Sequence, residues 1–136
     1  MIVVDTGVLL GAADADDCDN DRCAQLLRDY RGELFVPAPV VPETAWLIER
    51  NLGPAAEARF IRLITSGMLI VADLAVIDYN RCAELIDAYA DLGLGLVDAS
   101  VVAIAEKLDI VTIASLNHRD FNVVRPSHVT AFELLP

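Results

Sequence analysis

Acidic side chains recur in this chain at points where apolar segments begin or end. One follows the β-branched run at residues 2–4, one follows Pro42, one opens the apolar segment 96–106, and two polar residues follow the apolar run 109–114. They are Asp5, Glu43, Asp98, Asn117 and Asp120. Carboxylate and amide oxygens, with no Cys or His among the ligands, suit a hard divalent cation such as Mg²⁺ or Mn²⁺. We therefore expect these five residues to supply the ligands of one metal site.

A site of this kind is suited to phosphodiester hydrolysis. Carboxylates packed together without metal repel one another, and at least one of them is forced to hold a proton. A bound cation removes the repulsion, bridges to a phosphate, activates a water and stabilises the developing charge. Each acid also has a structural explanation by itself, since Glu43 complements a helix dipole and Asp98 is a favoured N-cap. The joint placement of the acids favours the metal site.

The first strand determines where Asp5 lies. Residues 2–4 form an unbroken β-branched run, which is typical of a strand covered on both faces at the centre of a parallel sheet. Thr6 and Gly7 then allow a tight turn from strand to helix. Asp5 is therefore expected at the carboxyl end of a central strand, where open α/β sheets bind ligands.

Strand and helix patterns alternate along the rest of the chain. Further strands are expected at residues 33–36, 68–71, 109–114 and 128–133, and helices at 21–30, from Pro42 onward, and at 55–64, 74–89 and 96–106. This order predicts an α/β fold, a three-layer α/β/α sandwich with a central, mostly parallel sheet. Right-handed crossovers place strand ends and the helix starts that follow them along one rim, so the five ligands can meet there.

Length and composition favour a single domain without a membrane segment. We expect all 136 residues to form that domain, residues 1–136. Mean hydropathy is +0.47, but every apolar run is far shorter than the ~20 residues that a spanning helix needs. No basic segment precedes the first apolar run, as a signal peptide requires. Three cysteines without paired spacing argue against a disulfide framework, so we expect a cytoplasmic protein with reduced thiols.

The charge balance is strongly acidic. Ten Lys and Arg stand against 21 Asp and Glu, and the net charge is −11. This balance opposes unassisted phosphate binding and favours a basic partner protein or a site that requires a cation. The acidic segment at residues 12–21 is expected to be a solvated loop, because it lacks the Gly and the terminal Glu of a calcium-binding loop.

Four motifs together resemble a known family. They are Val4-Asp5-Thr6-Gly7-Val8-Leu9, Pro42-Glu43 ahead of an apolar helix, Val97-Asp98-Ala99-Ser100, and Ile113-Ala114-Ser115-Leu116-Asn117-His118-Arg119-Asp120-Phe121. In this order, over essentially the whole chain, they resemble the PIN-domain ribonucleases, and among these the VapC-type toxins of bacterial toxin–antitoxin modules. The resemblance implies Mg²⁺-dependent RNA cleavage with Asp5, Glu43 and Asp98 as the catalytic acids. It also implies a homodimer and an antitoxin that covers the cleft, and a basic antitoxin segment would suit a toxin of charge −11.

One position departs from the family pattern. Where the family usually carries a fourth Asp after the last long strand, this chain has Asn117. An Asn offers a carbonyl oxygen but no negative charge, so the expected effect is weaker binding of one metal or slower cleavage. Asp120, three residues later, can compensate by reaching into the site. The serious alternative to an enzyme is therefore a PIN-fold protein that binds RNA or an antitoxin and cleaves poorly.

Four further residues are candidates for substrate contact. Arg119 is the best placed near the rim and Arg22 is next, while Thr6 and Ser100 carry hydroxyls that either order metal-bound water or cap helices. Two other phosphoryl-transfer folds fit less well. A haloacid-dehalogenase phosphatase needs a second Asp at the position of Gly7, and a receiver domain needs adjacent acids and a late Lys, neither of which is in place.

Overall fold

A five-stranded parallel sheet forms the centre of the protein, and the computed structural model describes all 136 residues. The strands are β1 (Ile2–Val4), β2 (Leu34–Pro37), β3 (Ile70–Ala72), β4 (Thr112–Ala114) and β5 (Glu133–Leu135), in the sheet order β3-β2-β1-β4-β5. The helices are α1 (Thr6–Ala13), α2 (Asn20–Asp29), α3 (Val40–Leu52), α4 (Pro54–Thr65), α5 (Val76–Ala88), α6 (Leu96–Lys107) and α7 (His118–Val123), with a short 3₁₀ helix, η1, at Ala90–Leu92. All four strand pairings are parallel.

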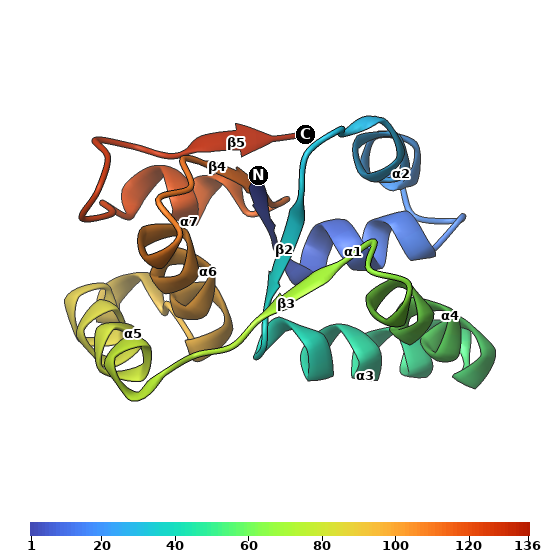
Figure 1. The fold of residues 1–136 in the computed structure, drawn as a ribbon, viewed down its shortest axis with the longest axis horizontal. Coiled ribbons are helices and arrows are strands. Elements are labelled where there is room, and N and C mark those ends of the chain that lie inside the picture. Colours follow the sequence, from blue (N-terminus) through green and yellow to red (C-terminus); the bar gives the residue numbers. More distant parts are fainter.

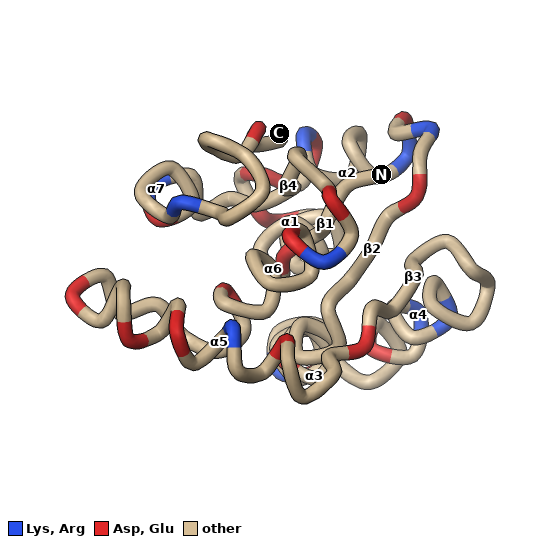
Figure 2. The backbone as a smooth tube through the Cα atoms, turned by 60° about the vertical axis from the view of Figure 1, so that its left-hand side comes forward, with Lys and Arg blue, Asp and Glu red and all other residues tan.

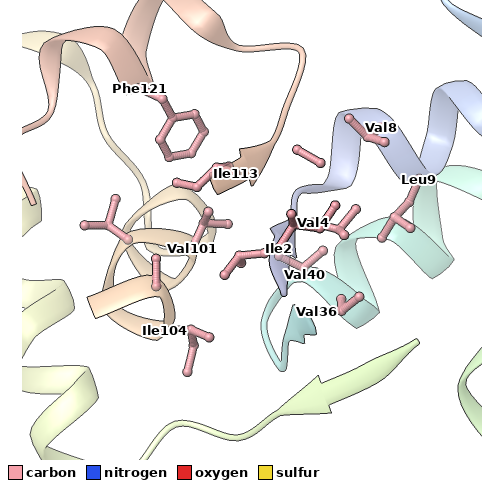
Figure 3. Packing of buried hydrophobic residues seen from close by; sticks show 14 of the residues in the cluster. Ile2, Val4, Val8, Leu9, Val36, Val40, Val101, Ile104, Ile113 and Phe121 are labelled. Carbon is pink, nitrogen blue, oxygen red and sulfur yellow. The ribbon is translucent and has the colours of Figure 1, made fainter. Parts of the chain in front are cut away.

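Helices cover the sheet on both faces (Figure 1). The connections from β1 to β2 and from β2 to β3 run through α1–α4 on one side, and the connections to β4 and then β5 run through α5, α6 and α7 on the other. Figure 3 shows Val8 of α1 and Val101 of α6 on opposite sides of β1, and both side chains are fully buried. The predicted three-layer α/β/α sandwich is confirmed.

The central strand and the central helix are apolar because both are enclosed. Ile2, Val3 and Val4 of β1 are fully buried, as the unbroken apolar run predicted. In α6, every residue from Ala99 to Ala105 is buried, because this helix packs against β1, β2 and β4. None of the helices combines the length and the hydropathy needed to span a bilayer.

The last strand lies later in the chain than predicted. It was expected at residues 128–133 and is observed at Glu133–Leu135, paired with β4. The preceding residues bend, and His128 Nε2 contacts the Ile110 carbonyl oxygen at 2.9 Å in place of a backbone ladder. The β-branched pattern of this segment was therefore misleading, since tertiary packing overrides strand propensity.

Two helix starts also differ from the prediction. The segment after β4, where no helix was predicted, forms α7, which the Asn117 side chain caps by accepting from the Asp120 N–H. Helix α3 begins at Val40, so Pro42 is its third residue. Proline is tolerated there because the first four helical N–H groups have no partner within the helix.

The chain leaves two neighbouring strands in opposite directions. β1 leads into α1 on one face of the sheet, and β4, which pairs with β1, leads into α7 on the other face. A place where two adjacent strands lead to helices on opposite faces is called a topological switch point. In open α/β sheets, ligands bind there, at the carboxyl ends of the strands. Asp5 directly follows β1 and Asn117 follows β4 by three residues, so the fold brings both to this place.

Two ion pairs link α5 to α6. Arg81 donates to both carboxylate oxygens of Glu106, each at 2.8 Å, and Lys107 Nζ lies 2.7 Å from Asp78 Oδ2. Glu106 also accepts from the Ser127 N–H at 2.8 Å. Burial opposes the ionisation of Glu106, but the hydrogen bonds outweigh it and lower the pKa of this carboxyl. The pair therefore contributes to stability in its ionised form.

Glu106→Gln should lower the free energy of unfolding at pH 7 by about 1.5–3 kcal/mol, because it removes the charged acceptor of these hydrogen bonds. The folded-state pKa of Glu106 lies below its ordinary value of 4.5, so the contribution is present above that pH and is lost as the pH falls through the lowered pKa. Urea unfolding across this range measures the effect. The control is Glu84→Gln, which removes a 68% exposed partner of the same arginine and should cost less than about 1 kcal/mol. If both variants lose the same unfolding free energy, the Arg81–Glu106 pair contributes no more to stability than an exposed ion pair.

Candidate active site

Asp5 lies at the end of β1 with both carboxylate oxygens held in place. It is 6% exposed, and one oxygen accepts from the Thr6 N–H while the other accepts from the Ser115 hydroxyl, each at 2.7 Å. The first contact makes Asp5 the N-cap of α1. Burial raises the pKa of Asp5 above its ordinary value against these two hydrogen bonds, and the Glu43 carboxylate adds to the rise. The side chain is therefore fixed between two adjacent strands.

Glu43 reaches the same place from α3. It lies in the first turn of that helix and is exposed, and its Oε2 accepts from the Thr6 hydroxyl at 2.6 Å. Thr6 directly follows Asp5, so a single residue connects the junction of β1 and α1 to the start of α3. The Thr6 hydroxyl was expected to order water or to cap a helix, and the structure uses it to hold a carboxylate.

Asp98 is half-buried at the start of α6. Its pKa is raised from 3.8 to about 6, first by burial and then by the carboxylates of Asp5, Asp120 and Glu43. Hydrogen bonds to a carboxylate would lower its pKa, and none contributes here. Asp98 is therefore the carboxyl around which the other three gather, and no group of the protein balances its charge.

Asp120 faces these carboxylates from α7. It is 8% exposed, Arg119 Nε donates to its Oδ1 at 2.8 Å, and Asn117 Nδ2 donates to its Oδ2 at 2.9 Å. The Arg119 guanidinium and then the Asn117 amide lower the pKa of Asp120. Asp120 is therefore held ionised, and Asn117 uses its amide nitrogen to position this neighbouring carboxylate.

The donor set fits a hard divalent cation. Four carboxylates from four separate segments converge, and no His or Cys is among them. Arg119 is the one cation paired with this group, and its side chain is 81% exposed. A half-buried carboxyl with a raised pKa and no donor of its own is the chemistry expected of oxygen ligands whose charge a metal would balance.

Two residues expected to contact substrate lie apart from this group. Arg22, on α2, pairs with Asp19 at 2.6 Å and makes no ion pair with the four carboxylates, so its contact with substrate stays a prediction. Ser100 is fully buried, and its hydroxyl donates to the Val97 carbonyl oxygen at 2.6 Å. The Ser100 hydroxyl makes no hydrogen bond to the four carboxylates, so its contact with substrate also stays a prediction.

The acidic segment after α1 forms local turns. Asp14 accepts from the Asp16 N–H at 3.0 Å, and Asp17 accepts from the Asp19 N–H at 2.7 Å. The side-chain donor atoms of Asp17, Cys18 and Asp19 lie within 4.8 Å of one another. Their exposure and local hydrogen bonds are those of the solvated loop predicted from the sequence. Elsewhere too, acidic residues are spread over most elements and basic ones are few (Figure 2).

Ser115 is the site residue that sequence reasoning missed. It is fully buried, and its hydroxyl donates to Asp5 and accepts from the Asn117 N–H at 3.0 Å. It therefore links the acid after β1 to the N-cap of α7. In the sequence, the sign that Ser115 belongs to the site is its position directly after the apolar run of β4. Only the pairing of β1 with β4 shows that its hydroxyl contacts Asp5.

Comparisons with known proteins place the chain in a family. Residues 2–125 match the PIN domain. The chain belongs to the PIN domain family. It is 27% identical over 135 residues to Ribonuclease VapC26 of Mycobacterium tuberculosis, an alignment that covers 99% of this chain and all of that protein. The resemblance to VapC-type proteins predicted from the four motifs is confirmed.

Two solved structures share the fold. The crystal structure of VapC20 from Mycobacterium tuberculosis, described as a Sarcin-Ricin loop cleaving toxin, matches with a TM-score of 0.85 at 20% identity and covers 96% of this chain and 99% of its own. FitAcB from Neisseria gonorrhoeae matches with a TM-score of 0.66 at 14% identity and covers 100% of this chain and 97% of its own. At these identities the likeness establishes the PIN-like fold.

Asp98→Asn should stabilise the metal-free protein at pH 7.5. The folded-state pKa of about 6 lies above the ordinary 3.8, so the unfolding free energy falls as the pH rises between these values and stays lower above them. Asn removes that penalty, which solvent screening at a half-buried site limits to about 1–2 kcal/mol. Urea unfolding in EDTA at pH 7.5 and pH ~4 measures the gain, which should vanish at the lower pH.

The matched control for this measurement is Asp91→Asn, an exposed acid of η1 whose substitution should change stability by less than about 0.5 kcal/mol. Added Mg²⁺ should stabilise the wild-type protein, because a ligand that binds the folded state raises its stability. The difference in unfolding free energy between Asp98→Asn and wild type should therefore become smaller. A variant Asp98→Asn that is less stable than wild type in EDTA at pH 7.5 would refute the repulsion described here.

Proposed function

We propose that this protein is a Mg²⁺-dependent endoribonuclease that acts as the toxin of a type II toxin–antitoxin system. The observation that carries the proposal is the meeting of Asp5, Glu43 and Asp120 around Asp98, whose pKa is raised to about 6. Membership of the PIN domain family supports it, because the similar VapC26 is named a ribonuclease and VapC20 is described as a toxin. The proposal places the protein in the cytoplasm, where RNA is available.

Asp5, Glu43, Asp98 and Asp120 would hold the ion, with Mn²⁺ as a possible substitute for Mg²⁺. When bound, the ion supplies positive charge that attracts a phosphate, acidifies a water and stabilises the charge developed during hydrolysis. The positive charge of the bound ion explains how a chain of net charge −11 would bind a phosphodiester, since its own basic residues are few.

The other residues of the site keep the acids in position. Ser115 orients Asp5, and the Thr6 hydroxyl orients Glu43, each through a single short hydrogen bond. Fixed ligands of this kind lose little freedom when they bind an ion or when the substrate reacts. Arg119 is the most exposed partner in the group, so its guanidinium is the one available to a phosphate of the RNA backbone.

In this proposal Asp120, and not Asn117, is the fourth acid. Its carboxylate is buried and ionised beside Asp98, whereas Asn117 donates a hydrogen bond to it and has its own oxygen turned to the start of α7. The negative charge that Asn117 lacks is supplied three residues later. This arrangement favours the nuclease over the alternative, a PIN-fold protein that binds RNA or an antitoxin and cleaves weakly.

The proposed partners follow from charge and from exposed apolar surface. A cognate antitoxin with a basic segment would cover the acidic site, since opposite charges favour such an association. For the proposed homodimer, α5 offers apolar side chains to a second copy: Val76 is 80% exposed, Ile77 is 74% exposed and Tyr79 is 49% exposed. Apolar side chains gathered on a surface in this way are typical of protein interfaces.

The purified protein should cleave a mixed pool of structured RNA with Mg²⁺ or Mn²⁺ and not with EDTA. Asp5→Asn should slow cleavage by about 100-fold or more, because it removes one charge from the ligand set while keeping the side chain's shape. Gel analysis of initial rates measures this. Asp87→Asn, an exposed acid of α5, is the control and should cleave at the wild-type rate. Cleavage that persists in EDTA or in Asp5→Asn would refute the metal-dependent nuclease.

Asp120→Asn should reduce cleavage by about 10- to 100-fold, because it removes the fourth charge. Asn117→Asp should not accelerate cleavage, since a second carboxylate beside Asp120 replaces a hydrogen-bond donor by a repelling charge. Initial rates over a range of Mg²⁺ concentrations separate the effect on metal binding from the effect on turnover. Faster cleavage by Asn117→Asp together with an unaffected Asp120→Asn would show that position 117 is the fourth ligand position.

A further inference from the structure

One exposed stripe of α3 runs away from the candidate active site. Val40, Thr44 and Ile48 form the buried face of this helix. Glu43, Trp46 and Arg50 are all exposed and, at positions i, i+3 and i+7, share a different face of the helix. Trp46 therefore lies about 4.5 Å further along the axis than the acid that contacts Thr6.

Trp46 presents a partly exposed ring beside a cation that forms no ion pair. It is 56% exposed, although a large aromatic side chain is usually buried in a folded domain. The Arg50 guanidinium lies 5.2 Å from the ring centroid in a cation–π arrangement, and Arg50 forms none of the ion pairs of the protein. An exposed aromatic ring next to an arginine without an ion pair is unusual in a chain of net charge −11.

This pair matches the chemistry of a single-stranded nucleic acid. Aromatic rings and guanidinium planes stack on unpaired bases, and the positive charge attracts the phosphate backbone. A basic antitoxin segment fits the face less well, because Arg50 would repel it. The continuity of the stripe with Glu43 places a base that stacks on Trp46 close to the phosphate that the acids would receive.

We propose that Trp46 and Arg50 form a base-stacking subsite, in which Trp46 stacks on an unpaired base next to the scissile phosphate and Arg50 holds the adjoining backbone. The subsite rests on the proposed ribonuclease function and specifies its substrate as RNA with an unpaired base at the cleavage position. It positions the strand and takes no part in the bond-breaking step.

Trp46 is the sole tryptophan of the chain, so intrinsic fluorescence reports on it alone. The wild-type protein with Mg²⁺ is titrated with a single-stranded, 2′-O-methylated oligonucleotide that resists cleavage, and with an abasic oligonucleotide of the same length. We expect quenching by the first and little by the second. Trp46→Ala should weaken binding of the base-containing strand by about 5- to 30-fold, measured by anisotropy of a labelled oligonucleotide, and Trp46→Phe should restore most of it. Arg50→Gln should weaken binding of both strands.

The control is Met68→Ala, which truncates an apolar side chain of nearly equal exposure, 55%, and should leave binding unchanged. Absent quenching, together with equal affinity in Trp46→Ala and wild type, would overturn the subsite. An unchanged RNA affinity with loss of a dimer in Trp46→Ala would also overturn it and assign the face to a second copy. Because binding is measured without cleavage, a wild-type protein that cleaves no RNA would refute the proposed function while the fluorescence result still decides the subsite.

Discussion

Repulsion among carboxylates that cannot move apart is the physical constraint on which this structure depends. Asp5 is buried directly after β1, Asp120 is buried within α7, and Asp98 is half-buried at the start of α6. Burial and the neighbouring carboxylates raise the pKa of Asp5 and of Asp98, whereas Arg119 and Asn117 lower the pKa of Asp120. Burial of the apolar core offsets the free energy that ionised carboxylates cost at neutral pH. All of β1 and seven consecutive residues of α6 are buried.

The topology of the sheet makes the convergence possible. β1 and β4 are neighbours whose chains depart to opposite faces, so the first residues after each strand come together. Ser115 and Thr6 then connect these ends to one another and to α3 by hydrogen bonds of 2.6–2.7 Å. The same contacts that satisfy buried polar groups therefore fix the directions of the acids. Stability of the junctions and preorganisation of the site come from one set of interactions.

The sequence predicted those features that local patterns determine. Unbroken apolar runs identified β1 and α6, and the positions of Asp5 and Asp98 at their ends followed directly. Features that depend on tertiary contacts were not accessible. The role of Ser115 depends on which strand lies beside β1, and the full burial of Ser100 depends on how α6 packs. The proposal of Asp120 in place of Asn117 as the fourth acid required the α7 N-cap, because the helical turn brings Asp120 near Asp98.

The central proposal is that Asp5, Glu43, Asp98 and Asp120 share one divalent cation. Anomalous diffraction from crystals grown with Mn²⁺ tests it most directly, because the signal locates the ion without assumptions about activity. We expect a strong peak among these carboxylates, within coordination distance of Asp98. A peak confined to the loop at Asp17 and Asp19, whose donor atoms lie within 4.8 Å of one another, would contradict the shared site, as would Mn²⁺-saturated crystals with no peak at Asp98.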